Sequence, residues 1–445
     1  MLWHYMKTKK HQMSQETTFK PTVQEDRINS LDVIRGIALL GILLMNINGM
    51  GLPFAYGDPS IAGGAEGLNL KVWIINNMLF EGTMRGLFTL LFGASVILLT
   101  SRLEKKGAGI AAADIYYRRT LWLLLFGIIN VYIFLWQGDI LYPYALLGLT
   151  LFPFRNASVK TLFSSAGVLL LCGSLWYVSD YHKAKEVQDA GVEMQALKDK
   201  GTTLSKKQET KLEAWTDQKT KHTAEEINEN IADRLQSNYF NVMLAKVKQN
   251  QIMQTYVMYR YWPWDILSFM LIGMAFFKLR IFHAEKSNKF YFIMLLVGYG
   301  VGLTVNYLET QIILDSNFNA VSIAKADQSY DLGRLFTTLG HVGLFMLFIK
   351  SGILGFLQKA LAAVGKTTLS NYLLTAIGTT IIFYGFGFGL YGKLQRFELY
   401  YVVAGFWVFQ LIASPLWLKY FKYGPFEWLW RSLTYQKWQD LKIKK

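Results

Sequence analysis

The sequence has a single cysteine and only six histidines among 445 residues. Because Cys172 has no second cysteine to pair with, an intramolecular disulfide framework and a cysteine-based metal site are excluded. No metal is expected. No HExxH, GxSxG, phosphate-loop or dinucleotide-binding glycine pattern occurs in a suitable context, so the common chemistries of soluble enzymes are not supported. No apolar core of signal-peptide length precedes Leu31, and the first apolar segment is therefore expected to be an uncleaved anchor.

Hydrophobic residues make up 52% of the chain, and they gather in long blocks separated by short basic ones. This pattern predicts an all-α, polytopic helical membrane protein rather than a large soluble core. The formal net charge of +15 would suit a nucleic-acid partner, but most lysines and arginines flank apolar blocks instead of forming one basic stripe. We therefore expect the lipid bilayer, and no nucleic acid, as the partner of these charges.

A helix needs about 20 mostly apolar residues to cross the hydrocarbon core of a membrane. The sequence contains ten candidate blocks, at residues 31–50, 84–101, 120–136, 139–154, 161–179, 260–279, 290–308, 331–350, 368–390 and 398–418. The ninth block is rich in glycine toward its end, so it could break or re-enter the bilayer instead of spanning it. Lysine and arginine concentrate in alternate short loops, which predicts ten spans with both termini in the cytoplasm.

These features divide the chain into five parts. A cytoplasmic N-terminal tail (1–30) precedes five spans (31–179), and a second set of five spans (259–418) precedes a cytoplasmic amphipathic tail (419–445). The segment between the two sets, 180–258, is charged and has partly helical spacing of its apolar residues. We expect it to form a helical hairpin or cap on the extracytoplasmic side, with a flexible linker as the alternative. The aromatic and basic C-terminal tail favours a helix in the headgroup region over one that lines a pocket.

Polar residues within the first span form the first candidate site. An ionisable group costs about 2.5 to 3.5 kcal/mol inside a membrane, so each one needs a partner or a water-filled cavity. Asp32 and Arg35 are three residues apart and share a helix face. They form either a capped helix start with a snorkelling arginine or a cytoplasmic site for an anionic group. Asn46 lies near the outer end of the same helix, where an amide ties helices together unless it faces a cavity.

Other polar residues lie near the ends and in the middle of later spans. Glu81 and Arg85 have the spacing of a helical ion pair. Asp139 lies in a short outer turn, where it is either a helix N-cap or an acid directed at an outer pocket. His341 is the only histidine expected within a span, about two turns after Arg334 and on nearly the same face. It is either a structural hydrogen-bonding group or a general base.

Several stretches resemble the YeiB family of bacterial integral membrane proteins. They are RINSLDVIRGIALLGILLMNI, LFTLLFG, RRTLWLLLFGI and GDILYPYALLG in the first half, and VGKTTLSNYLLTAIGTTIIFYGFGFGL and KYGPFEWLWRSLTY near the C-terminus. The resemblance implies a multi-pass protein of the bacterial plasma membrane, with a YeiB-type membrane domain over residues 259–418.

The opening SLDVIRGIALLGILLMNI also resembles the transmembrane acyltransferase superfamily, which includes heparan-alpha-glucosaminide N-acetyltransferase. The shared pattern is S-x-D-x-x-R-G followed by an asparagine, which corresponds to Asn46. The resemblance implies that residues 31–179 form an acyltransferase-like domain. Such a domain takes an acyl group from cytoplasmic acyl-CoA and delivers it to an acceptor on the far side, with an asparagine and a histidine involved in the transfer. The loop after Asn46 contains no histidine, so His341 is the imidazole left to replace it.

The leading hypothesis is therefore a membrane acyltransferase, or a descendant of one, with acyl-CoA as donor and an unidentified acceptor. The residues expected to bind substrates are Asp32, Arg35, Glu81, Arg85 and Arg334, and those expected to act in catalysis are His341, Asn46 and Asp139. The alternative is a transporter or lipid-binding membrane protein that uses the same scaffold without acyl transfer. Transport would be supported by inverted repeats, and the sequence has no clear internal repeat. A homo-oligomer is compatible with either hypothesis.

Overall fold

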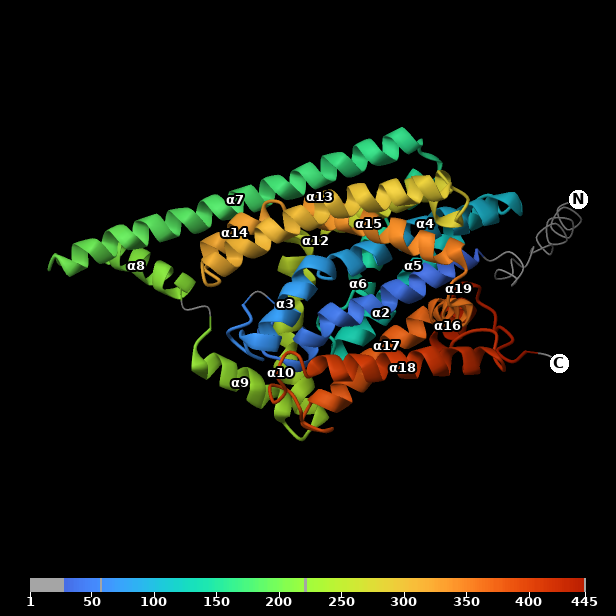
Figure 1. Cartoon of the computed structure of the whole chain (residues 1–445). Helices are drawn as coiled ribbons and strands as arrows, with labels where there is room; N and C mark the ends of the chain where they lie inside the picture. The colour runs from blue at the N-terminus through green and yellow to red at the C-terminus, as the bar shows by residue number, and fades with distance from the viewer. Residues whose placement is uncertain (1–27, 57, 220–221, 444–445) are drawn as a thin grey trace, which may run out of the picture.

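The structure is a computed structural model that describes residues 28–56, 58–219 and 222–443 (Figure 1). All named elements in these ranges are helices, and the one strand-like contact is an isolated bridge between Phe421 and Lys442. The predicted all-α class is confirmed. The expected cytoplasmic N-terminal tail lies almost entirely outside the described residues, which begin at Ile28.

In the part of the chain that the structure describes, six helical segments are long and apolar enough to cross a membrane. They are α2 (Asn29–Gly51), α3 (Gly67–Leu79) together with α4 (Thr83–Lys105), α7 (Val159–Asp199), α13 (Asn288–Asp315), α15 (Tyr330–Ser351) and α18 (Leu399–Leu418). Each of them contains or overlaps one of the predicted blocks. A chain with this many long apolar helices is compatible with a multi-pass membrane protein.

The other predicted blocks form shorter or less apolar helices. They are α5 (Ala111–Tyr132), α6 (Leu141–Gly148), α12 (Trp262–Lys278) and α17 (Thr368–Phe383). Helix α6 has only eight residues and leads into a short 3-10 turn, Phe152–Asn156. After Phe383 the chain folds back, and the Tyr391 N–H donates to the Phe383 carbonyl oxygen (2.8 Å). The glycine-rich end of the ninth block therefore interrupts the helix, which is one of the two outcomes that the sequence allows.

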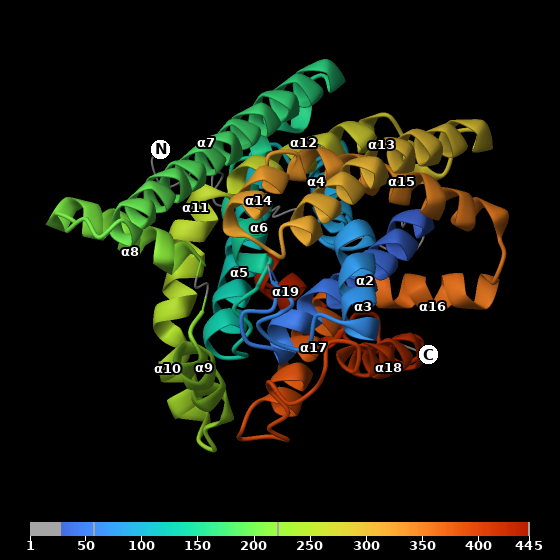
Figure 2. The ribbon, with the colours of Figure 1, turned by 60° about the vertical axis from the view of Figure 1, so that its left-hand side comes forward.

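The charged segment between the two predicted sets of spans is helical. It contains α8 (Lys206–Lys219), α9 (Ala224–Leu235), α10 (Tyr239–Ile252), a π turn (Met253–Val257) and α11 (Met258–Arg260). Helix α7 passes through the expected boundary at residue 180 without a break, and α8 packs back along it. A capping box between Thr223 and Glu226 begins α9. Helix α10 packs against α5, and α9 packs against α10 (Figure 2), so the segment is helical rather than a flexible linker.

Helix α2 lies at the centre of the bundle. In its most apolar stretch 83% of the residues are buried inside the protein, compared with 17% for α7 and for α18. It packs against α4, α17, α18 and α16 (Gly355–Lys366), a helix that the sequence does not predict. Helices α2 and α16 approach most closely at Gly36 and Gly365, where an added Cβ would overlap backbone carbonyl oxygens of the other helix. Such packing by small residues is typical of membrane helices, and it directs the polar groups of α2 into protein.

Candidate functional site

A pocket lies at the end of the bundle where α2 begins. Helices α2, α4, α5 and α17 form its walls together with α19 (Pro425–Thr434), and the cavity has a volume of about 250 Å³. Five cationic side chains line it: Arg35, Arg102, Arg119, Lys366 and Arg431. We call this cavity the basic pocket.

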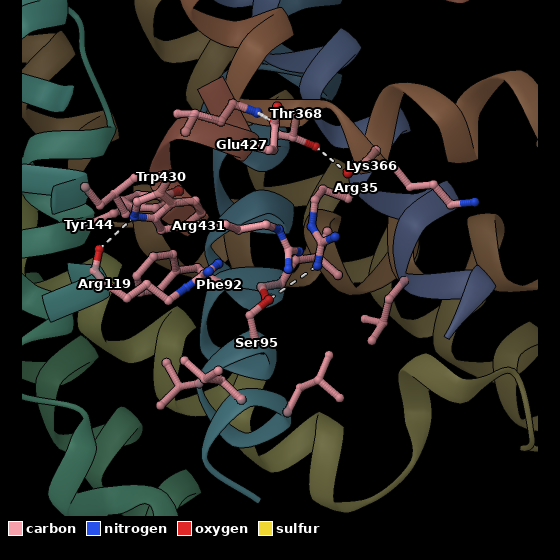
Figure 3. A pocket seen from close by; sticks show the side chains of 18 of the residues that line it. Arg35, Phe92, Ser95, Arg119, Tyr144, Lys366, Thr368, Glu427, Trp430 and Arg431 are labelled. Carbon is pink, nitrogen blue, oxygen red and sulfur yellow. Dashed lines mark hydrogen bonds between the residues drawn. The ribbon is translucent and has the colours of Figure 1, made fainter. Parts of the chain in front are cut away.

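The cations of the basic pocket come from different helices, and three of them face one space. Figure 3 shows Arg35, Arg119 and Arg431 directed into that space, whereas the Lys366 amine extends away from it. The Arg119 guanidinium lies over the Trp430 ring, 3.6 Å from the ring centroid. This stacking holds the guanidinium in place and leaves its N–H groups able to donate in the plane of the group.

Two carboxylates also line the basic pocket, and both have partners. Arg35 Nη1 donates to Asp32 Oδ1 (3.0 Å), and Arg35 Nη2 donates to the Ser95 hydroxyl (3.3 Å). Glu427 accepts a hydrogen bond from the backbone N–H of Leu369 (2.5 Å) in the first turn of α17, where a negative charge stabilises the helix. Among the described residues that line the basic pocket, five are therefore cationic and two are carboxylates. The excess of positive charge suits an anionic ligand.

The rest of the basic pocket is apolar and aromatic. Its lining includes Phe88, Phe92, Leu123, Leu141, Tyr144 and Tyr372. Along α4 the lining runs from Arg102 to Phe88, which corresponds to about 21 Å at the helical rise per residue. The pocket is thus charged toward the start of α2 and apolar further in. A ligand with an anionic head and an uncharged, extended tail fits this order.

Asp139 lies directly behind the inner wall of the basic pocket. Its Oδ1 accepts a hydrogen bond from Asn130 Nδ2 (2.7 Å) and lies 3.3 Å from the Tyr372 hydroxyl, and its Oδ2 accepts from the Tyr142 N–H (2.7 Å). The side chain is buried. Asp139 therefore accepts a hydrogen bond from a backbone N–H in the first turn of α6, as a capping side chain does, although the N-cap residue itself is Ile140. Only one tyrosine hydroxyl separates Asp139 from the pocket.

Asn46 lies on the same face of α2 as Arg35 but outside the basic pocket. They are eleven positions apart, which corresponds to about three helical turns and about 16 Å. Gly49, one turn further on, lines a second cavity near the opposite end of α2. Asn46 is buried, and its place on the helix is between the two cavities.

Glu81, Arg85 and Arg334 lie in ion pairs elsewhere in the bundle rather than in the basic pocket. The Arg334 guanidinium pairs with Glu309 and lies 3.5 Å from Glu81 Oε2, and Arg85 pairs with Asp265 (2.6 Å). The predicted pair between Glu81 and Arg85 is wrong. The physical reason is that α3 ends before Glu81 and α4 begins after it, so the two residues do not share a continuous helix. These pairs connect α4, α12, α13 and α15.

Replacing Glu309 by glutamine should destabilise the protein strongly. The Arg334 side chain that faces it is only 5% exposed, and breaking one side of a buried ion pair costs about 3 to 5 kcal/mol. Thermal unfolding of the purified variant should therefore show a lower Tm. As a matched control, Glu104→Gln breaks a more exposed pair with Arg155 (2.9 Å) and should change the stability by no more than about 1 kcal/mol. Equal shifts for the two variants would contradict this role of Glu309.

His341 is buried in another part of the bundle. Its Nε2 lies 2.8 Å from the Leu79 carbonyl oxygen and its Nδ1 lies 2.7 Å from the Tyr299 hydroxyl. The ring therefore donates to the carbonyl and accepts from the tyrosine, and it does not line the basic pocket. This geometry suits the structural alternative for His341. In the ranges that the structure describes, no three histidine, cysteine, aspartate or glutamate side chains gather closely enough to hold a metal ion.

Several residues of the basic pocket are not candidates from the sequence alone. The sequence indicates that Arg102 and Arg119 are charges of short loops, and that Trp430 and Arg431 belong to a tail in the headgroup region. In the structure α19 packs against α5 and α17, and Trp430 Nε1 donates to the Arg119 carbonyl oxygen (2.8 Å). Pocket lining, the alternative for this tail, is confirmed for α19. The sequence signal that indicates pocket lining is the mixture of tryptophan and arginine in this tail.

Comparisons with known proteins agree with one another. Residues 276–437 match the model of the family described as "Protein of unknown function (DUF418)". The chain is 31% identical to the uncharacterized protein YxaH of Bacillus subtilis, over 96% of this chain and 99% of that protein. It is also 31% identical to the uncharacterized protein YeiB of Escherichia coli, over 92% of this chain and 96% of that protein. No solved structure matches the chain.

Proposed function

The chain belongs to the family of YeiB-type membrane proteins, and on that premise we propose that it is a membrane-embedded acyltransferase, or a descendant of one. It would take an acyl group from acyl-CoA and pass it to an acceptor that arrives from the other end of the bundle. The observation that carries the proposal is the basic pocket, which joins five cationic side chains to an aromatic and apolar interior. The resemblance of the first helix to the transmembrane acyltransferase superfamily points to the same donor.

Acyl-CoA has the charge distribution that the basic pocket fits. Its phosphate groups are anionic, whereas its pantetheine arm and acyl chain are long, thin and uncharged. Arginine binds phosphate through several N–H groups at once, and Arg35, Arg119 and Arg431 face one space (Figure 3). A cavity of about 250 Å³ is smaller than the sites of about 300 to 1,000 Å³ that hold whole small molecules. We therefore expect the nucleotide to stay at the arginines and the thioester to reach toward Tyr372.

The transfer requires a proton acceptor near the thioester. A hydroxyl or amine of the acceptor attacks the carbonyl carbon, a C–O or C–N bond forms, the C–S bond breaks and coenzyme A leaves as a thiolate. In our proposal the proton of the acceptor passes to the Tyr372 hydroxyl, whose own proton moves to Asp139 Oδ1, 3.3 Å away. The proton then returns to the thiolate, which regenerates the site. His341 would hold α15 in position, and Asn46 would lie along the path between the two ends of α2.

The proposal includes a finer topology of ten crossings with both termini in the cytoplasm. The six long apolar segments would be joined by α5, by α6 with its 3-10 turn, by α12 and by α17. Most lysines and arginines of the short loops then lie at the end of the bundle where α2 begins, and the positive-inside rule assigns that end to the cytoplasm. The basic pocket would thus face the side on which acyl-CoA is found. The proposed location is the bacterial plasma membrane.

A transporter or lipid-binding protein is the second candidate. An anionic lipid also has a charged head and an apolar chain, so the lining of the basic pocket suits it as well. The specific observation in favour of transport is the interruption of α17 after Phe383, because discontinuous helices often line transport sites.

Acyl-CoA should protect the purified protein against thermal unfolding. A ligand that binds only the folded state adds about 2.7 kcal/mol to the stability when its concentration is 100 times its Kd. Saturating acyl-CoA of several chain lengths should therefore raise the Tm, and free coenzyme A should raise it less. The double variant Arg35→Gln/Arg119→Gln should lose this increase.

The matched control for this experiment is Lys160→Gln, which changes an exposed lysine in the first turn of α7. It removes one positive charge outside the basic pocket and should keep the full increase in Tm. If no acyl-CoA moves the Tm of the wild-type protein, the donor is wrong. If acyl-CoA does not raise the Tm but an anionic phospholipid does, and the double variant Arg35→Gln/Arg119→Gln loses that increase, the lipid-binding candidate replaces the acyltransferase.

A further inference from the structure

A second cavity lies near the opposite end of α2 from the basic pocket. It has a volume of about 240 Å³, and Gly49 of α2 is part of its lining. Its polar lining includes Gln137, His222, Asn230, Arg234, Gln249 and Tyr391. We call this cavity the distal pocket. Because α9 and α10 supply three of these residues, the charged segment 180–258 builds one wall of it.

Arg234 lines the distal pocket, and the residue is only 4% exposed. Its Nη1 donates to the Asn230 carbonyl oxygen (3.2 Å), and its Nη2 donates to Gln249 Oε1 (2.8 Å) and Gln137 Oε1 (3.4 Å). The guanidinium also faces the Tyr391 ring, 5.0 Å from the centroid. All of these partners are neutral. Over the described ranges of the chain, no carboxylate forms an ion pair with Arg234.

An arginine keeps its positive charge when it is buried, because the guanidinium is not deprotonated in proteins. A buried charge without a counter-ion is unfavourable, and amide oxygens compensate for it only in part. The Glu226 carboxylate on α9 is engaged by other groups: it lies 3.3 Å from His222 Nδ1 and accepts from the Thr223 N–H (3.1 Å). The electrostatics of the distal pocket therefore favour an anion beside Arg234.

We propose that the distal pocket is a second ligand site, which binds a phosphate group carried by a soluble polar molecule or by a lipid headgroup. A planar guanidinium can donate to two phosphate oxygens. The side-chain amides of Gln137 and Gln249 can bind hydroxyl groups next to the phosphate, because each amide is both a donor and an acceptor. In the proposed function this ligand is the acyl acceptor, and only that identification rests on the proposed function.

The position of the distal pocket brings such a ligand close to Asp139. Gln137 lines the distal pocket and Leu141 lines the basic pocket, so the chain between them, which includes Asp139, separates the two cavities. The same loop is held from the charged segment, because Lys246 Nζ donates to the carbonyl oxygen of Leu135 (2.6 Å), a residue in the left-handed region (φ 63°). The segment 180–258 therefore both builds the distal pocket and positions the loop that separates it from the basic pocket.

Binding of phosphate-bearing probes to the full chain in phosphatidylcholine nanodiscs tests the proposal. Inorganic phosphate and glycerol 3-phosphate represent a soluble ligand, and added phosphatidylglycerol represents a lipid headgroup. At least one of them should raise the Tm of the wild-type protein, whereas glycerol should not. Arg234→Gln should weaken this binding by about tenfold or more, since it removes hydrogen bonds to a charged group. The probe that raises the Tm shows whether the phosphate comes from a soluble molecule or from a lipid headgroup.

Two further variants separate the possible results. Arg234→Lys keeps the charge but loses the planar pair of donors; it should bind with an intermediate affinity, and it takes the place of Arg234→Gln if that variant does not fold. Lys160→Gln, which removes a positive charge outside both pockets, should bind the probes as the wild type does. The proposal is overturned if no phosphate-bearing probe binds, if both Arg234 variants bind like the wild type, or if Arg35→Gln/Arg119→Gln loses the binding while both Arg234 variants keep it. Protection by acyl-CoA, measured on the same samples, tests the proposed function separately.

Discussion

Gly273→Val should prevent the protein from folding into a stable, monodisperse form. Gly273 of α12 lies against the backbone of Leu90 of α4, and an added Cβ would overlap the Leu90 carbonyl oxygen and lie 2.6 Å from its carbonyl carbon. The contact is reciprocal, because a Cβ on Gly93 of α4 would overlap the Met270 carbonyl oxygen of α12. Neither backbone can rotate away as a side chain could. The two helices would have to separate along their whole contact.

The expected loss for Gly273→Val is about 3 kcal/mol or more, at the upper end of the cost of overpacking a core. Size-exclusion chromatography in detergent and the Tm of any folded fraction measure it. Gly300→Val is the matched control, because Gly300 lies on α13, is exposed and has no atom within 4 Å of an added Cβ. The control should fold normally. A folded Gly273→Val protein with an unchanged Tm would mean that α4 and α12 do not pack this closely.

The apolar blocks of the sequence predict the helical class because burial in lipid requires long, continuous apolar stretches. The central helix α2 is an example of what the sequence predicts correctly. Its limits follow from the sequence to within a few residues. Asp32 and Arg35, which the spacing places on one helix face, form an ion pair and line the basic pocket. The short helix α6 could not be predicted from the sequence. An eight-residue helix and a 3-10 turn have the same apolar composition as one continuous span.

The basic pocket could not be predicted as a whole, because its residues meet only through long-range packing. Arg119 and Trp430 are 311 positions apart in the chain and touch through α5 and α19. The spacing of Glu81 and Arg85 is misleading for a related reason. Local spacing predicts an ion pair only if one helix runs through both residues, and the break between α3 and α4 lies at Glu81. Tertiary contacts, not local patterns, select the partners of these charges.

If the chain catalyses the proposed acyl transfer, Asp139→Asn should abolish most turnover while acyl-CoA still protects the protein. The amide has nearly the same shape as the carboxylate but cannot take up a proton in its place, and a general base contributes about 10²- to 10⁴-fold to a rate. Tyr372→Phe removes the hydroxyl that lies between Asp139 and the basic pocket, and the loss should be of similar size. Release of the coenzyme A thiol from the reconstituted protein measures turnover, and the Tm with and without acyl-CoA measures donor binding.

Measurements of turnover and of the Tm distinguish proton transfer by Asp139 from a role only in capping α6. If Asp139 only caps α6, its replacement lowers the Tm of the free protein by an amount corresponding to about 1 kcal/mol and leaves the pH dependence of turnover unchanged. If the carboxylate accepts the proton, wild-type turnover decreases in acid as Asp139 becomes protonated, and this decrease is absent from the residual activity of Asp139→Asn. Asp114→Asn is the control, because Asp114 is an exposed carboxylate of α5 that pairs with Arg118. It should alter neither the Tm nor the pH dependence of turnover. Full turnover in Asp139→Asn would restrict Asp139 to the helix cap and leave the Tyr372 hydroxyl to act without it.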